Sequence, residues 1–130
     1  MSSTNSPARV WDFLGIRVVG TGEGSATVEM LPSEDMANQA GFVHGGMIST
    51  LADIGMARSV RTIPGIERAT SFDLKVTFIS AAKLGEPLQA KGRVIHAGNR
   101  TAVAECRVEG PGEKLVATAS GTFVVIREKE

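Results

Sequence analysis

The chain has 130 residues, of which 42% are hydrophobic and 22% are charged. These are ordinary values for a globular protein, and the length suits one domain with its own core. Fourteen basic and fourteen acidic residues cancel, so no overall field favours nucleic acid or an anionic membrane. The one cysteine, Cys106, cannot form an internal disulfide, which is typical of a reducing cytoplasm.

The first residues do not resemble a targeting segment. Residues 1–7 are mostly small and polar, without the apolar core of a signal peptide. They predict a disordered lead-in to a single domain over residues 8–130. No run approaches the roughly 20 apolar residues that span a bilayer. We therefore expect a soluble, cytoplasmic protein with no membrane partner and no nucleic-acid partner.

A short helix and a hairpin are the first elements predicted. Alternating apolar and polar residues favour strands at 16–19 and 26–30, joined by a turn through the glycine-rich residues 20–24. Before them, residues 10–14 predict a helix that packs three apolar side chains on the core: Trp11, Phe13 and Leu14.

The most apolar segment predicts a helix from Gly45 or Gly46 to about Arg61. Apolar or small residues extend round most of it, which indicates a buried helix. Later residues alternate and predict four strands, at 71–78, 88–94, 101–108 and 115–126. A buried helix with antiparallel strands indicates an α+β fold in which a sheet wraps around the helix. Small residues on the inner strand faces would leave room for it: Ala90, Gly92, Ala102, Ala104, Ala117 and Ala119.

Two glycines at the start of this helix predict backbone N–H donors aimed at a ligand. Gly45 and Gly46 carry no side chain, so nothing shields the N–H groups at the positive end of the helix dipole. A thioester or ester carbonyl placed there would meet an oxyanion-type donor. The alternative is that the glycines only permit tight packing of the loop.

Two polar residues precede the glycines. Asn38 can orient a water molecule without titrating, although a lone asparagine is more often an ordinary turn residue. His44 can cap the helix or donate to a carbonyl, although a lone histidine is more often structural.

Asp53 is a carboxylate in the most apolar segment of the chain, between Ala52 and Ile54. A buried, unpaired carboxylate is costly, so it needs a partner, a proton or a function. The alternative is that it lies on a solvated face near Arg58. Asp53 follows Gly45 by eight residues, or about 12 Å along a helix axis. It therefore cannot easily reach a carbonyl at its own helix start, whereas an antiparallel second copy can bring its Asp53 there. The spacing predicts a homodimer with two shared sites.

At this point the chain resembles a known family, the hotdog-fold acyl-CoA thioesterases of the PaaI type. The residues that carry the resemblance are Asn38, the triplet His44-Gly45-Gly46 and the helical Leu51-Ala52-Asp53. It continues through Ser71–Leu74, residues 78–86 and residues 119–123, and covers about residues 10–126. The resemblance implies a long helix wrapped by a curved sheet, dimers whose sheets join edge to edge, and usually homotetramers. It implies no metal and no organic cofactor.

The resemblance also implies roles for single residues. The Gly45 N–H would polarise the thioester carbonyl, with His44 supporting that region and Gly46 contacting the substrate. Asp53 of the partner subunit would act as a general base on water or as a nucleophile. Asn38 would position the water or the acyl group, and Ser71 would assist from the following strand.

Acyl-CoA would bring phosphates that need local cations. Asn99 and Arg100 resemble positions where relatives contact the nucleotide, with Lys83, Arg58 and Arg61 as weaker candidates. The alternative for each is a solvated surface charge.

Two other functions stay open on this scaffold. One is a non-catalytic acyl-CoA-binding protein, against which the joint presence of Asn38 and Asp53 argues, because a binder needs no carboxylate facing a carbonyl. The other is a hotdog dehydratase, whose histidine–carboxylate pattern is not visible around His44 and His96. The identity of the acyl group is not predicted.

Overall fold

The computed structural model describes residues 9–129. The expected lead-in over residues 1–7 lies outside the described residues. The β-strands form one antiparallel sheet in the order β1-β2-β4-β5-β6-β3. In chain order the elements are α1 (Arg9–Leu14), β1 (Arg17–Gly22), β2 (Ser25–Met30), η2 (Glu34–Met36), α2 (Gly45–Arg61), β3 (Ile66–Phe78), β4 (Leu88–Ala97), β5 (Thr101–Glu109), η3 (Pro111–Glu113) and β6 (Leu115–Arg127).

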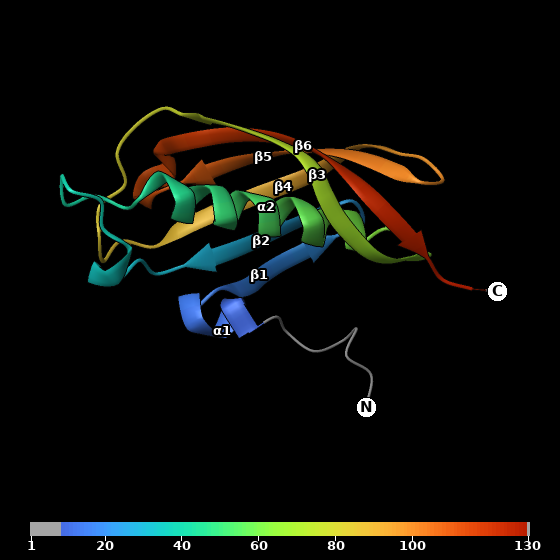
Figure 1. Ribbon diagram of the computed structural model, residues 1–130, viewed down its shortest axis with the longest axis horizontal. Coiled ribbons are helices and arrows are strands. Elements are labelled where there is room, and N and C mark those ends of the chain that lie inside the picture. Colours follow the sequence, from blue (N-terminus) through green and yellow to red (C-terminus); the bar gives the residue numbers. More distant parts are fainter. Residues whose placement is uncertain (1–8, 130) are drawn as a thin grey trace.

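The long helix α2 lies along the inner face of the sheet, which curves around it (Figure 1). Its buried residues meet the inner residues of the strands in one core, and Leu51, Val108 and Phe123 are completely buried there. Burial of this apolar surface is the main stabilising force. The predicted α+β architecture is confirmed.

Small residues bring α2 very close to β4. A Cβ atom added to Gly92 would lie 2.5 Å from Ser59 Oγ and 2.7 Å from the carbonyl oxygen of Gly55. Ser59 is itself buried and donates its hydroxyl to the Gly55 oxygen at 2.8 Å. Ala90, Ala102 and Ala104 are fully buried, so small side chains on the sheet make room for the helix as predicted.

Replacing Gly92 with alanine should therefore lower the free energy of unfolding by about 1–3 kcal/mol, the usual range for overpacking. The clash is with Ser59 Oγ and with backbone atoms of Gly55, and the backbone atoms cannot move without displacing α2. The matched control is Gly20→Ala in β1, where an added Cβ meets nothing within 4 Å, and its effect should stay within about 0.5 kcal/mol. Urea unfolding followed by circular dichroism measures both, and equal effects would contradict this packing.

The N-terminal hairpin differs from the prediction. Gly20 and Gly22 pair with Thr27 and Ser25, so β1 continues through most of the predicted turn. Only two residues, Glu23 and Gly24, connect the strands, and Gly24 has a φ of +81° that favours glycine. A register shift between Val18 and Gly20 accommodates the extra length.

The packing expected of α1 is correct for two of its three apolar residues. Leu14 is buried and Trp11 packs beside the guanidinium of Arg58, 5.7 Å from the ring centre. Phe13 is 84% exposed, so its predicted burial is wrong. A helix of six residues presents only one narrow face to the core, and Phe13 points off it.

β3 is an edge strand with an uncovered apolar side. It begins at Ile66, five residues before the predicted start, and pairs only with β6 among the described residues. Phe72, Leu74 and Phe78 are exposed, although their alternation is that of a half-buried strand. A long edge strand with exposed apolar residues is a surface that proteins normally cover.

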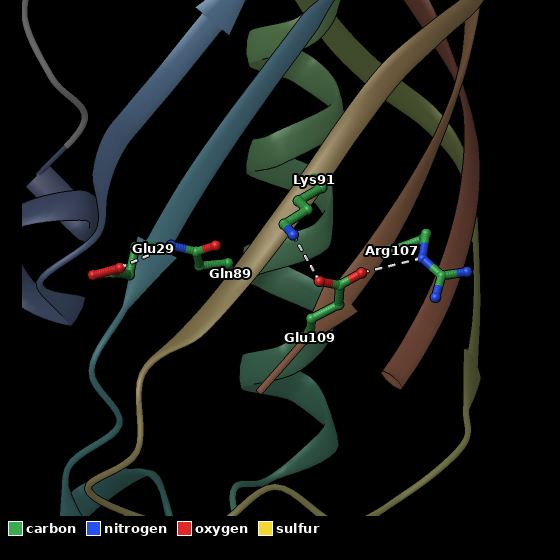
Figure 2. A network of polar contacts seen from close by, with 5 residues as sticks. All are labelled: Glu29, Gln89, Lys91, Arg107 and Glu109. Atoms are coloured by element: carbon green, nitrogen blue, oxygen red, sulfur yellow. Dashed lines mark hydrogen bonds and ion pairs between the residues drawn. The ribbon is translucent and has the colours of Figure 1, made fainter. Parts of the chain in front are cut away.

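A network of polar contacts lies on the outer face of the sheet, away from α2 (Figure 2). The Glu109 carboxylate forms an ion pair with Lys91 Nζ at 2.8 Å and accepts a hydrogen bond from Arg107 Nε at 3.2 Å. The interaction with Lys91 is the main cause that lowers the pKa of Glu109, and the same interaction with Glu109 is the main cause that raises the pKa of Lys91. Gln89 donates to Glu29 at 3.1 Å, which lowers the pKa of Glu29. These charges satisfy one another within the sheet, so we read the cluster as structural.

Candidate active site

His44 forms the cap at the start of α2. Its backbone is extended, with φ of −62° and ψ of 138°, and its Nδ1 accepts the N–H of Gly46 at 3.0 Å. The N–H of Gly45 has no acceptor within residues 9–129. Of the two glycines, Gly45 alone therefore offers a free donor at the positive end of a 17-residue helix.

Asn38 shapes the loop before the helix. Its Oδ1 accepts the N–H groups of Ala40 at 2.9 Å and Phe42 at 3.1 Å, and its own N–H donates to the Phe42 oxygen at 2.7 Å. The turn is completed by Gly41, whose φ is +84°. Asn38 thus has the loop role given as the alternative, while its side-chain nitrogen makes no hydrogen bond to a described residue.

A groove of about 350 Å³ joins this loop to the helix start. It is mostly apolar, and Gly45 lies in its wall together with Phe78, the last residue of β3. Periodicity did not indicate that Phe78 and Ile79, at and just after the end of β3, would line this groove, because that contact depends on how the sheet folds over α2. Residues that line it include Asn38, Phe42, Gly45, Ile48, Phe78 and Ile79.

Asp53 lies two turns further along α2 and outside the groove. The residue is half-buried, and its Oδ1 is buried without a hydrogen-bond partner in the structure. Gly55 packs on Ala90 of β4, and two residues correspond to about 200° around a helix. The Asp53 side chain therefore projects from the side of α2 that faces away from β4. It is half-buried, whereas the apolar sequence around it suggested full burial.

Ser71 is half-buried in β3 and pairs with the inward-facing Phe123 of β6. Because directly paired residues share a face of the sheet, Ser71 points toward the helix side. A bulge follows it before Asp73. Ser71 is not part of the groove that contains Gly45.

Asn99 and Arg100 lie at the other end of the molecule. They are exposed in the β4–β5 turn, which Figure 1 shows beyond the end of α2. Arg127 holds this turn by donating to the carbonyl oxygens of Gly98 at 2.7 Å and Asn99 at 3.4 Å. The length of α2, about 24 Å, separates this end from Gly45 of the same chain. By contrast, the backbone of Lys83 bridges to that of Phe42, beside the groove.

A polar cavity of about 550 Å³ surrounds the C-terminal end of α2, with Arg58 and Arg61 in its wall. Burial lowers the pKa of Arg58, and the neighbouring Arg61 adds to this effect. Three carboxylates line the same cavity: Glu23, Glu67 and Glu128. Mixed charge of this kind does not select an anion, so neither arginine gains support as a nucleotide contact.

The remaining chemistry-bearing groups are few. Burial raises the pKa of the Cys106 thiol to about 12, so it stays protonated and is not a nucleophile. Within residues 9–129 no three His, Cys, Asp or Glu side chains are grouped to hold a metal ion. In the same residues no helix is long and apolar enough to cross a membrane.

Known proteins share this sequence pattern. Residues 40–117 match the Thioesterase superfamily. The acyl-coenzyme A thioesterase PaaI of Escherichia coli is 29% identical over 110 residues, covering 83% of this chain and 76% of that protein. Human acyl-coenzyme A thioesterase 13 is 32% identical over 91 residues, covering 67% and 62% of the two chains.

Solved structures agree with the sequence matches. The PaaI protein from the Escherichia coli phenylacetic acid degradation operon has a TM-score of 0.86 and 28% identity, covering 92% of this chain and 85% of that one. A Streptococcus mutans protein bound to acetyl CoA has a TM-score of 0.78 and 28% identity, covering 88% and 91%. The fold and the matches together define a hotdog-fold enzyme of the thioester hydrolase class. The chain belongs to the thioesterase superfamily.

Proposed function

We propose that the protein hydrolyses an acyl-CoA or aryl-acyl-CoA thioester to the free acid and CoA, in a homodimer with shared sites. The observation that carries this proposal is the unpaired N–H of Gly45, which starts α2 inside a mostly apolar groove. An unpaired donor at a helix start is suited to a carbonyl oxygen that gains negative charge. The relatives named acyl-coenzyme A thioesterases support the choice of CoA esters.

In the proposed reaction the thioester oxygen accepts the Gly45 N–H. Asp53 of the partner subunit takes a proton from a water molecule as its oxygen attacks the carbonyl carbon. The tetrahedral intermediate then collapses, the C–S bond breaks, and the sulfur leaves as the CoA thiol after receiving the proton. Asn38 orients the water or the acyl group, and Ser71 assists from β3.

The exposed side of β3 supports the dimer. Its free edge and the apolar residues Phe72 and Leu74 are uncovered in the single chain. An antiparallel second copy placed against this edge would cover them and continue the sheet. The same arrangement sets two α2 helices in opposite directions, which offers each Gly45 an Asp53 from the other chain. A homotetramer of two such dimers remains our expectation.

The dimer also suits the proposed nucleotide contacts. Asn99 and Arg100 are far from Gly45 of their own chain, whereas antiparallel pairing turns the corresponding end of the second copy toward the site. We propose that these two residues contact the CoA phosphates.

Mixing two inactive variants tests the shared site. Gly45→Pro removes the donor and Asp53→Asn removes the base, so each homodimer should hydrolyse acyl-CoA at a small fraction of the wild-type rate. Co-expression gives heterodimers in which one of the two shared sites is intact, and random pairing should restore about a quarter of wild-type turnover. Release of CoA measured with a thiol-reactive dye gives the rate.

The control is a mixture prepared from separately folded variants that have not exchanged subunits, which should stay inactive. Failure of the co-expressed mixture to recover, with heterodimers verified by two affinity tags, would place Gly45 and Asp53 of one site in the same chain. Tight binding of acyl-CoA by wild-type protein without any turnover would instead establish the non-catalytic alternative.

A further inference from the structure

The groove beside Gly45 is suited to an apolar group that carries one carbonyl. No charged side chain is among the described residues that line it. Its serine, Ser80, is already used, since the hydroxyl donates to the Leu115 oxygen at 2.7 Å. Asn38 Oδ1 is used by its own loop. The phosphates of CoA would find no cation in this groove, so its occupant is the acyl end of the substrate.

Phe78 lies against Gly45, the residue that carries the proposed donor. A Cβ atom added to Gly45 would lie 3.1 Å from Phe78 Cζ and 3.3 Å from Cε1, so the ring rests against the glycine. The position of Phe78 is fixed by the sheet, because it pairs with Ala117 of β6 and the next N–H, of Ile79, donates to the Val116 oxygen at 2.8 Å. The ring is 52% exposed, so its other side borders open space.

We propose that Phe78 is a specificity-determining residue, whose ring sets the width of the acyl group that can bring its carbonyl to the Gly45 N–H. This inference rests on the proposed thioesterase function. The substituents on the acyl carbon next to the carbonyl lie beside the Phe78 ring when the carbonyl reaches the Gly45 N–H. A straight or planar acyl group therefore fits, whereas an α-branched group clashes with the ring. Discrimination by one carbon atom in an apolar pocket is typically about 10–200-fold.

The test compares straight-chain acyl-CoAs with their α-methyl isomers of equal carbon number, such as butyryl-CoA and isobutyryl-CoA. Phe78→Leu shortens the side chain and should raise the branched-to-straight ratio of kcat/KM by about tenfold or more. Phe78→Trp enlarges it and should lower the same ratio. The matched control is Phe13→Leu, because Phe13 is an exposed phenylalanine of α1 outside the groove, and the ratio should not change.

Melting temperature and sedimentation velocity establish that each variant is folded and has the wild-type oligomeric state. An unchanged ratio in both Phe78 variants, or a shift of the same sign in both, would overturn the role of Phe78 while leaving the thioesterase function intact. Absence of turnover by the wild-type protein with every acyl-CoA would contradict the proposed function, and the role of Phe78 with it.

Discussion

Replacing Asp53 with asparagine should lower kcat at least about 100-fold while acyl-CoA still binds, as expected when a general base is lost. Asparagine has nearly the same size and shape, so packing on α2 is preserved. The buried Asp53 Oδ1 has no hydrogen-bond partner, which makes the carboxylate unfavourable for stability. The variant should therefore melt at the same temperature as the wild type or at a higher one, and losing activity without losing stability is typical of a functional residue.

Steady-state kinetics with a thiol-reactive dye and thermal melting measure the two effects separately. Asp12→Asn is the matched control, since Asp12 is an exposed aspartate in α1, and it should leave kcat unchanged. Near-normal turnover in Asp53→Asn would refute the assignment of Asp53 as the base. A large fall in melting temperature would show that its carboxylate holds the fold together instead.

The sequence was a good guide to the helix and to the inner faces of the sheet. The apolar residues of α2 and the small residues opposite them are both required for the helix to pack closely against the strands. Both patterns can therefore be recognised in the sequence without coordinates. Gly92 and Gly55 show how strict this demand is. The order of the strands is a different matter, because β3 lies next to β6 and not next to β4, and periodicity contains no information about such pairing.

Exposure was the least predictable property. Phe72 and Leu74 alternate with polar residues as a buried strand face does, yet they are exposed because β3 is at the edge of the sheet. Phe13 is exposed for a different reason, the narrow contact face of α1. An alternating pattern thus identifies a strand without telling which element, or which second chain, covers it.

The candidate site likewise contains a part that local sequence rules predict and a part that depends on long-range contacts. Asn38, His44 and Gly45 are close in sequence, and local rules of turns and caps predict their arrangement. Phe78 reaches Gly45 only because the sheet closes over α2, a long-range contact that no local pattern contains. Asp53 stays apart from Gly45 in the single chain, in agreement with the spacing argument.

Replacing Gly45 with proline removes the proposed donor with little disturbance of the helix. Gly45 is the first residue of α2, a position where proline is favoured because its missing N–H would be unpaired anyway. The extended backbone of His44, with ψ of 138°, is the conformation preferred before proline. Since the N–H of Gly45 has no acceptor in the described residues, no internal hydrogen bond is lost. We expect kcat to fall by about 10²–10³-fold, the usual cost of one oxyanion donor.

Gly45→Ala is the control that separates the donor from the added carbon. Both variants place a Cβ near the ring of Phe78, at 3.1 Å before any adjustment, but only alanine keeps the N–H. If the N–H stabilises the transition state, proline should be slower than alanine by at least about 100-fold in kcat, with similar melting temperatures. Equal loss in the two variants would assign the effect to crowding against Phe78, and the carbonyl would then need another donor.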